Sequence, residues 1–272
     1  MGTGLISFVG AGPGAADLIT LRGAHRLATA DVVVWASSLV PAAVVEHCRD
    51  GAELHDSAGM TLEDVLAVYA AHPDAAIVRL HDGDVSLYSA LTEQITWCTS
   101  HDRRFEIVPG VGSLAAAAAA AGVELTAPGV AQSAVLTRLG GGRTEASMPP
   151  GESVAGFAGH GTTMAIYLSA ARPAALRAEL LAGYPSQTPA VIVAKASWPD
   201  ETVITTTVDG LADALTAAGI RTAALVLVGP ALAGAGDRSR LYDPAYSHGC
   251  RRRSESGSSV GRPIPTSKRR RP

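Results

Sequence analysis

Short apolar, β-branched runs alternate along this chain with stretches of helical character. The expected strands are Leu5–Val9, Val32–Trp35, Ala76–Leu80, Phe105–Val108, Ser133–Arg138, Met164–Leu168, Ala190–Ala194, Thr202–Thr207 and Ala223–Val228. The expected helices between them are Arg22–Thr29, Pro41–His47, Leu62–Ala71, Ser89–Thr99, Leu114–Ala121, Ala174–Leu181 and Leu211–Ala218. Consecutive parallel strands need a crossover connection, usually a helix, so this alternation predicts parallel βαβ units and the α/β fold class.

The chain is expected to divide near the segment Pro109–Gly112, because the four strands before it already make a small sheet. We predict an N-terminal α/β domain at residues 1–111 and a C-terminal α/β domain at residues 112–248. A ligand cleft is expected between them, since ligands commonly bind at domain interfaces. The segment Gly140–Gly151 has no periodicity and is predicted to be a flexible loop or a linker.

The net charge of −3 hides a basic C-terminal segment. From Arg251 to Pro272 the chain has eight basic residues and one Glu, so the rest of the chain is acidic. Such a segment can bind nucleic acid, but this one lacks aromatic residues for base stacking, and an acidic body suits a phosphate backbone poorly. We therefore predict that residues 249–272 form a disordered, solvated tail and that the protein has no nucleic-acid partner.

The composition excludes several other classes of protein. Apolar residues make up 47% of the 272 residues, yet no apolar run reaches about 18 residues, so we expect no membrane span and no membrane partner. The chain starts without a charged and apolar leader, and its cysteines form no C-x-x-C pair. We expect no signal peptide, no disulfide framework and a cytoplasmic location. The eight histidines show no metal-ligand spacing, so no metal site is predicted.

The segment "LISFVGAGPGAADLIT", which follows the first strand, has the glycine pattern of a nucleotide-binding loop. A dinucleotide-binding loop also needs an acid at the end of the second strand, but here that strand ends in Trp35, Ala36 and Ser37. Pro13 removes a backbone donor that a phosphate would use. These features disfavour a nicotinamide-dependent oxidoreductase, and a tight turn of purely structural importance stays possible.

Two further turns of small residues follow later strands. "VRLHDGDVSLYS" ends a strand and places Asp82, Gly83 and Asp84 in succession, and "VPGVGS" forms another Pro–Gly turn. Glycine allows a close approach of backbone to ligand, and the carboxylates suit a cation or the hydroxyls and amine of a nucleoside. Because the carboxyl ends of parallel strands share one edge, all three turns are expected to meet there and bind a ligand.

These motifs resemble those of the tetrapyrrole methyltransferases, S-adenosylmethionine (SAM) enzymes of cobalamin and sirohaem biosynthesis. The similar segments lie between about Phe8 and Tyr246 and are "VGAGPGAADLITLRG", "ADVVVWASSLV", "DSAGMTLE", "VRLHDGDVSLYSALTEQ", "VPGVGSLAAAAAAAGVELTAPGVAQSAVLTR", "ASWPDE" and "AALVLVGPAL". Within the family, "DSAGMTLE" and "KASWPDE" are most similar to the branch that methylates precorrin-4. Two positions depart from the common family pattern: Val85 replaces the Pro of "GDPS", and Ala36 replaces the Asp of the uroporphyrinogen enzymes.

The resemblance implies two α/β domains, a homodimer, and SAM in the cleft between the domains. It implies methylation of precorrin-4 at C-11 to give precorrin-5, with cobalt-precorrin-4 as an alternative substrate. The positions that match the family's SAM-binding residues are Pro13, Asp82, Gly83, Asp84, Leu87, Gly112, Ser113, Leu168, Ala196, Ala224, Leu225 and Val226.

In the implied reaction a ring carbon attacks the methyl group directly, so the protein needs no nucleophilic side chain. Asp56 and His81 are candidate catalytic residues that would accept a proton after methylation. Asp56 has a helix-capping role as its alternative, and His81 has a structural hydrogen bond. The substrate carries many carboxylates, which favours cationic and hydroxyl groups around it. The candidate substrate-binding residues are Ser37, Ser38, Met60, Arg79, Gln132 and Arg138.

Overall fold

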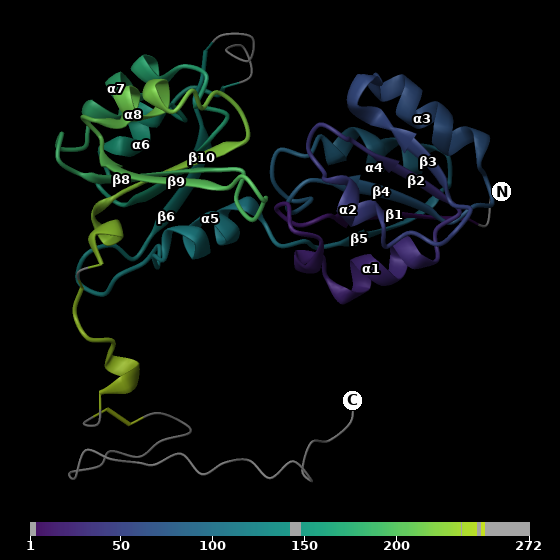
Figure 1. The fold of residues 1–272 in the computed structure, drawn as a ribbon, viewed down its shortest axis with the longest axis horizontal. Coiled ribbons are helices and arrows are strands. Elements are labelled where there is room, and N and C mark those ends of the chain that lie inside the picture. The colour runs from purple at the N-terminus through teal and green to yellow at the C-terminus, as the bar shows by residue number, and fades with distance from the viewer. Residues whose placement is uncertain (1–3, 142–147, 235, 244–245, 248–272) are drawn as a thin grey trace.

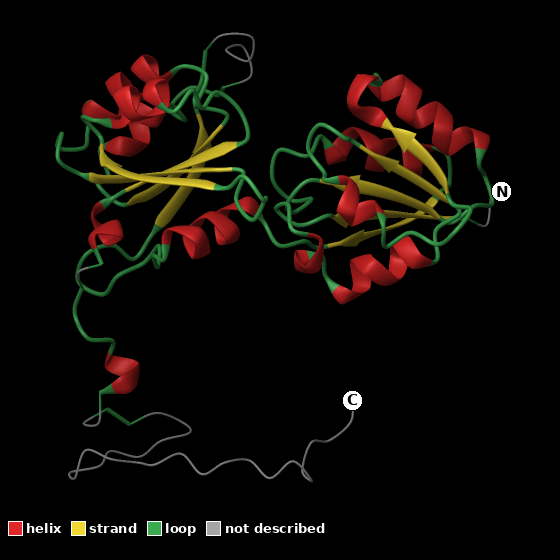
Figure 2. Cartoon of the chain, in the orientation of Figure 1, coloured by secondary structure: helices red, strands yellow, loops and turns green. Residues whose placement is uncertain are grey.

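The computed structural model describes residues 4–141, 148–234, 236–243 and 246–247. They contain two five-stranded sheets with helices on both faces of each, which confirms the predicted α/β class (Figures 1 and 2). The predicted tail lies outside the described residues, and the predicted domain limits stay predictions. No helix within the described ranges is long and apolar enough to cross a bilayer. In the same ranges, no group of three or more His, Cys, Asp or Glu side chains is placed to hold a metal ion.

The first sheet has the strand order β3-β2-β4-β1-β5, and all of its strands are parallel. Its elements are β1 (Leu5–Gly10), α1 (Leu21–Ala28), β2 (Val32–Trp35), α2 (Ala42–Val45), β3 (Glu53–Asp56), α3 (Leu62–Ala71), β4 (Ile77–His81), α4 (Leu91–Ser100) and β5 (Arg104–Val108). The registers pair Gly10 with His81 and Trp35 with Asp56, so the carboxyl ends of these strands lie along one edge.

Alternating side chains of the first sheet enter two separate cores. In β4, Leu80 belongs to the core under α1 and α2, whereas Ile77 belongs to the core under α3 and α4. The same alternation places Arg79 and His81 on the α3 and α4 face, close to the carboxyl end of the strand. Both polar residues therefore lie beside an apolar core, at the edge where the turns gather.

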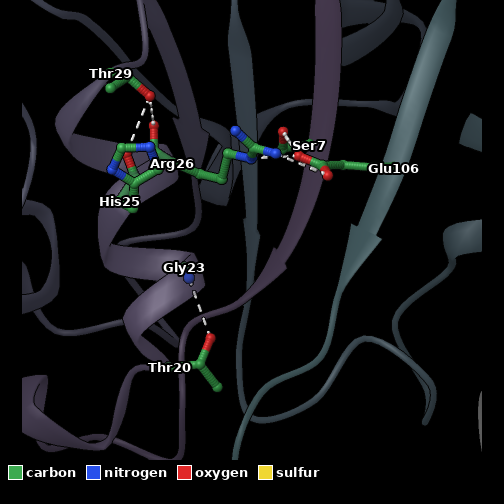
Figure 3. A network of polar contacts seen from close by, with 7 residues as sticks. All are labelled: Ser7, Thr20, Gly23, His25, Arg26, Thr29 and Glu106. Atoms are coloured by element: carbon green, nitrogen blue, oxygen red, sulfur yellow. Dashed lines mark hydrogen bonds and ion pairs between the residues drawn. The ribbon is translucent and has the colours of Figure 1, made fainter. Parts of the chain in front are cut away.

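A polar network fixes α1, the helix that follows the glycine loop, against the sheet (Figure 3). Arg26 of α1 contacts both carboxylate oxygens of Glu106 on β5, with Nε 2.5 Å from Oε1 and Nη2 3.1 Å from Oε2. The Ser7 hydroxyl of β1 donates to the same carboxylate at 2.7 Å. Burial acts to raise the pKa of Glu106, but the bonds from Arg26 and Ser7 outweigh it and keep that pKa below its usual value. The start of α1 is capped by the hydroxyl of Thr20, which accepts from the Gly23 N–H at 3.1 Å.

The second sheet has the strand order β6-β7-β10-β8-β9. Its elements are α5 (Ser113–Ala121), β6 (Ala134–Arg138), α6 (Val154–Ala158), β7 (Thr163–Tyr167), α7 (Pro173–Leu181), β8 (Pro189–Ala194), β9 (Thr202–Thr207), α8 (Leu211–Ala217) and β10 (Ala224–Val228). Leu225 and Leu227 of β10 pack with α5 on one face, and Val226 and Val228 pack with α6, α7 and α8 on the other. Ala117 of α5 is completely buried in the first of these cores.

The expectation of parallel βαβ units throughout is wrong for the second sheet. Only β6 and β7 are parallel, whereas β10 pairs antiparallel with β7 and β8, and β8 pairs antiparallel with β9. The segment 195–201 that joins β8 to β9 contains no helix that could return the chain to the other end of the sheet, so it closes a hairpin. This hairpin loop extends from the second sheet toward the first half of the molecule in Figure 1.

Candidate active site

The three glycine turns meet at the carboxyl edge of the first sheet, as predicted. Gly12 and Gly83 form a two-way backbone bridge, in which Gly12 N donates to Gly83 O at 3.1 Å and Gly83 N donates to Gly12 O at 2.8 Å. Gly10 and Gly110 touch through their Cα sides, because a Cβ on Gly110 would lie 2.8 Å from Gly10 Cα and even closer to Gly83 O. Only glycine permits this packing of backbone on backbone.

Asp84 joins the second of these turns to the third. Its Oδ2 accepts from Gly110 N at 2.8 Å, and its Oδ1 accepts from Ser86 N at 2.9 Å and from the Ser86 hydroxyl. Partial burial acts to raise the pKa of Asp84, but the hydrogen bonds from Ser86 and Gly110 outweigh it and hold that pKa below its usual value. The Asp84 carboxylate therefore holds the second and third turns together. The family resemblance predicted only a role in SAM binding for this residue.

Replacing Asp84 by Asn is expected to lower the free energy of unfolding by about 1–2 kcal/mol, since hydrogen bonds to a charged acceptor are lost from a partly exposed site. The native pKa is depressed, so this stabilisation is complete above the ordinary carboxyl pKa of about 4 and disappears as the pH falls through the lower native value. Urea unfolding of both proteins between pH 7 and pH 3 measures the effect. If the unchanged protein exceeded Asp84→Asn in stability by the same amount at pH 3 as at pH 7, the stabilising role of the Asp84 carboxylate would be contradicted.

Three residues form a mainly aromatic wall at this edge: Tyr88 from the first half of the chain, and Tyr167 and Leu168 from the second half. The ring of Tyr88 lies 5.1 Å from that of Tyr167, which ends β7, and the pKa of the Tyr167 hydroxyl is raised by burial and lowered by the nearby Ser113 side chain at the start of α5. Leu168 follows Tyr167 with φ of +51°, and 66% of its surface is exposed. Tyr88 also has a positive φ, of +55°. Such backbone conformations are costly for non-glycine residues and concentrate at functional sites.

The hairpin loop between β8 and β9 docks on the first glycine turn. The Trp198 indole N–H donates to Pro13 O at 2.9 Å, and the Ser197 hydroxyl accepts from Ala15 N at 3.0 Å. The indole ring covers Gly14, where any side chain would collide with it. The two halves of the chain are therefore joined directly at the turn that the family resemblance places near the cofactor.

A second cluster lies at the carboxyl ends of β2, β3 and β4. The Arg79 guanidinium donates to the Ser57 hydroxyl at 2.7 Å, and that hydroxyl donates to Trp35 O at 3.0 Å. Next to it, the Asp56 carboxylate accepts from both Ser37 N, at 3.0 Å, and the Ser37 hydroxyl, at 2.5 Å. The structure thus brings the predicted substrate residues Ser37 and Arg79 to adjoining strand ends.

The two candidate proton acceptors have environments that make them weak bases. The hydrogen bonds from Ser37, and after them the bond from Ala58 N, lower the pKa of Asp56, whose side chain caps the short helix Ser57–Gly59. Burial, followed by the charge of Arg79, lowers the pKa of His81 to about 3. The capping alternative for Asp56 is confirmed by this geometry. Proton transfer to either residue stays a prediction, and these low pKa values weigh against it.

The other predicted residues are more scattered. Arg138 pairs in register with Tyr167, and its charge acts on Tyr88, so it borders the aromatic wall. Met60 is partly buried against the core under α3 and α4. Ser38 and Gln132 are exposed, Leu87 is 37% exposed, and Val226 is buried. Ala196 and Leu225 are buried in the core against which Tyr167 packs. Val226 faces the α7 and α8 core, so its side chain points away from the α5 face.

Three residues at this edge were not identified from the sequence, namely Tyr88, Tyr167 and Trp198. Trp198 stands in the quoted segment "ASWPDE", but nothing in its spacing relates it to Pro13, which is far away in the chain. Tyr88 follows the "GDVSL" turn directly, so its closeness to the cofactor loop was a usable signal.

The structure is a two-sheet protein in which both halves of the chain contribute residues to the candidate site. Residues 5–212 match the family model described as Tetrapyrrole (Corrin/Porphyrin) Methylases. The chain therefore belongs to the tetrapyrrole methylase family.

Individual relatives agree with this membership. The chain is 42% identical to the precorrin-4 C(11)-methyltransferase of a Sinorhizobium species over 92% of its own length and 99% of that protein. The X-ray structure of a cobalt precorrin-4 methyltransferase, a cobalamin biosynthetic enzyme, superimposes with a TM-score of 0.81 at 41% identity, covering 84% of this chain and 95% of that one. A uroporphyrin-III C-methyl transferase from Thermus thermophilus, complexed with S-adenyl homocysteine, gives a TM-score of 0.70 at 26% identity, with 85% and 99% coverage.

Proposed function

We propose that this protein is a SAM-dependent C-methyltransferase that methylates precorrin-4 at C-11 to give precorrin-5 in cobalamin biosynthesis. The observation that carries the proposal is the likeness to the Sinorhizobium precorrin-4 C(11)-methyltransferase over nearly the full length of both chains. The site supports it, because the glycine turns and the aromatic wall suit a nucleoside. The neighbouring cluster contains the positively charged Arg79.

The residues at the glycine turns fit SAM as the methyl donor. Leu168 exposes 66% of its surface in a strained backbone conformation, which suits contact with an apolar ring such as adenine. Asp82 is exposed, and desolvation by the surrounding protein raises the pKa of its carboxyl. Its carboxylate can pair with the amino group of the ligand. The bound group would supply an activated methyl on a positively charged sulfur.

The protein's contribution to this reaction is positioning. Asp84 and the packed glycines hold the turns in place, and Trp198 fixes the first turn to the second half of the chain. Two reactants held in line at near-attack distance gain about 7–11 kcal/mol relative to free encounter. The rings of Tyr88 and Tyr167 form one side of the site. No side chain has to form a covalent bond with the substrate.

The structure argues against the nicotinamide-dependent oxidoreductase considered from the glycine pattern. The Cα side of Gly10 is covered by Gly110, and Gly14 is covered by Trp198, so the protein itself packs against the loop where a pyrophosphate would lie. The end of β2 has the partly exposed Trp35 where a ribose-binding acid is needed. Cobalt-precorrin-4 stays an alternative substrate, and the homodimer predicted from the resemblance stays a prediction.

Incubation with ¹³C-methyl-labelled SAM and precorrin-4, followed by NMR, tests the proposed function. One labelled methyl group is expected at C-11, and a parallel incubation with cobalt-precorrin-4 shows which metal state is preferred. Uroporphyrinogen III serves as the control substrate and should receive no label. Transfer to uroporphyrinogen III alone, or to another carbon of precorrin-4, would refute the proposal.

A further inference from the structure

Two arginines of the first half, the buried Arg103 and the partly buried Arg79, differ in their hydrogen-bond partners. Arg103 is 7% exposed, and its Nη2 donates to the carbonyls of His72 at 2.7 Å and Ala75 at 3.1 Å, while its Nη1 donates to Pro73 O. These bonds tie the end of α3 to the start of β5, so both Nη atoms of Arg103 are paired by the fold itself, although its Nε is buried without a partner. Arg79 has no comparable set of partners.

Two neighbouring donors of Arg79, Nε and Nη2, have no hydrogen-bond acceptor among the described residues. Its only hydrogen bond to the described residues is from Nη1 to the neutral hydroxyl of Ser57. Its Nε is buried without a partner, and no carboxylate in the described part of the chain lies within ion-pairing distance of the guanidinium. Asp82 acts on it electrostatically but is exposed to solvent. Burying a cation without an anion is costly, so this arrangement is more easily explained by an anionic ligand than by folding.

The same protein shows what the missing partner is in chemical terms. Arg26 holds the carboxylate of Glu106 with Nε and Nη2, the two donors that Arg79 leaves unused (Figure 3). A guanidinium presents these donors in a planar fork that matches the two oxygens of a carboxylate.

His81 adds a second unsatisfied polar atom on the same face of β4. It is 6% exposed, and its buried Nε2 has no hydrogen-bond partner. Burial and the neighbouring Arg79 charge keep the imidazole neutral, so it adds no positive charge that would have to be neutralised. A neutral imidazole offers one N–H donor and one acceptor.

We infer that Arg79, held by Ser57 and flanked by His81, receives a carboxylate side chain of the tetrapyrrole substrate. This inference rests on the proposed function and deepens it, since it assigns one edge of the macrocycle to the ends of β2, β3 and β4. The donor of the methyl group then lies beside it, at the turns that follow β1, β4 and β5.

Binding of uroporphyrin III, a stable macrocycle with eight carboxylates, tests the inference by fluorescence titration of the full chain. Arg79→Met is expected to weaken binding about tenfold or more, while SAM affinity measured by calorimetry stays the same. Arg177→Met is the matched control, because Arg177 pairs with Asp209 at α7 on the far side of the second sheet, and it should bind uroporphyrin normally. A cationic porphyrin without carboxylates should not distinguish Arg79→Met from the unchanged protein.

Thermal unfolding separates a ligand-binding role from a structural one. Without ligand, Arg79→Met should keep or raise the melting temperature, since a partly buried charge without an ion pair is removed, whereas Arg103→Met should lower it by several degrees. Unchanged uroporphyrin affinity in Arg79→Met, or a fall in its melting temperature like that of Arg103→Met, overturns the inference. If the unchanged protein does not bind uroporphyrin, the KM for precorrin-4 is the readout, and an unaltered KM in Arg79→Met overturns it equally. Failure of methyl transfer with retained, Arg79-dependent uroporphyrin binding would refute the proposed function but not this site.

Discussion

Gly110→Ala is expected to lower the free energy of unfolding by about 3 kcal/mol and to weaken SAM binding about tenfold or more. The new Cβ would lie 2.8 Å from the Cα of Gly10 and closer still to Gly83 O. All of these are backbone atoms in or next to paired strands, so no rotation of a side chain can relieve the collision. The third turn must then move away from the first two, and the hydrogen bond from Gly110 N to Asp84 is lost with it.

Gly59→Ala is the matched control for this change. Gly59 also lies just after a strand of the first sheet, but a Cβ there would meet nothing within 4 Å. Chemical denaturation and calorimetric titration with SAM measure both variants. A Gly110→Ala protein as stable as Gly59→Ala, with normal SAM affinity, would show that the three turns are not held together as the structure indicates.

The first sheet was largely predictable because its strands carry their own signal. Runs such as "VVVW" of β2 are β-branched and buried, and β2 begins and ends at the predicted residues. β3 was missed because "ELHD" has a single apolar residue; it forms a strand by pairing with β2 at the edge of the sheet. The short helix α6 was missed too, since "VAGFA" contains a glycine and follows a segment without periodicity.

The direction of the strands in the second sheet could not be predicted from local pattern. β10 reads as a buried strand in any sheet, and its antiparallel position between β7 and β8 is decided by packing of its two faces against α5 and against α6, α7 and α8. A rule that links alternating helices and strands to parallel pairing holds for the first half and fails for the second.

The site was predictable where strand ends determine it. The turns after β1, β4 and β5 had to meet, because the carboxyl ends of neighbouring parallel strands share an edge. What the sequence did not indicate is which atoms make the contacts: the Asp84 carboxylate holds Gly110 and Ser86, and Trp198 reaches Pro13 from the other half of the chain. These contacts depend on tertiary packing between segments far apart in sequence.

Trp198→Ala is expected to weaken SAM binding about tenfold and to lower the free energy of unfolding by about 2–3 kcal/mol, somewhat less than the loss of a fully buried aromatic residue. The variant loses the indole N–H bond to Pro13 O and the ring that covers Gly14, and both groups belong to the first glycine turn. The turn would then no longer be held by the second half of the chain, so the ligand would have to order it on binding.

Trp198→Phe separates the two parts of this effect, because it keeps an aromatic ring over Gly14 and removes only the N–H donor. It should retain most of the stability and lose about 1 kcal/mol for the hydrogen bond. Ser197→Ala provides a second comparison, since it removes the acceptor for Ala15 N from the same loop. If Trp198→Ala bound SAM as tightly as the unchanged protein, docking of the hairpin loop would be a structural contact alone, and the cofactor site would be made by the first sheet and its turns without this support.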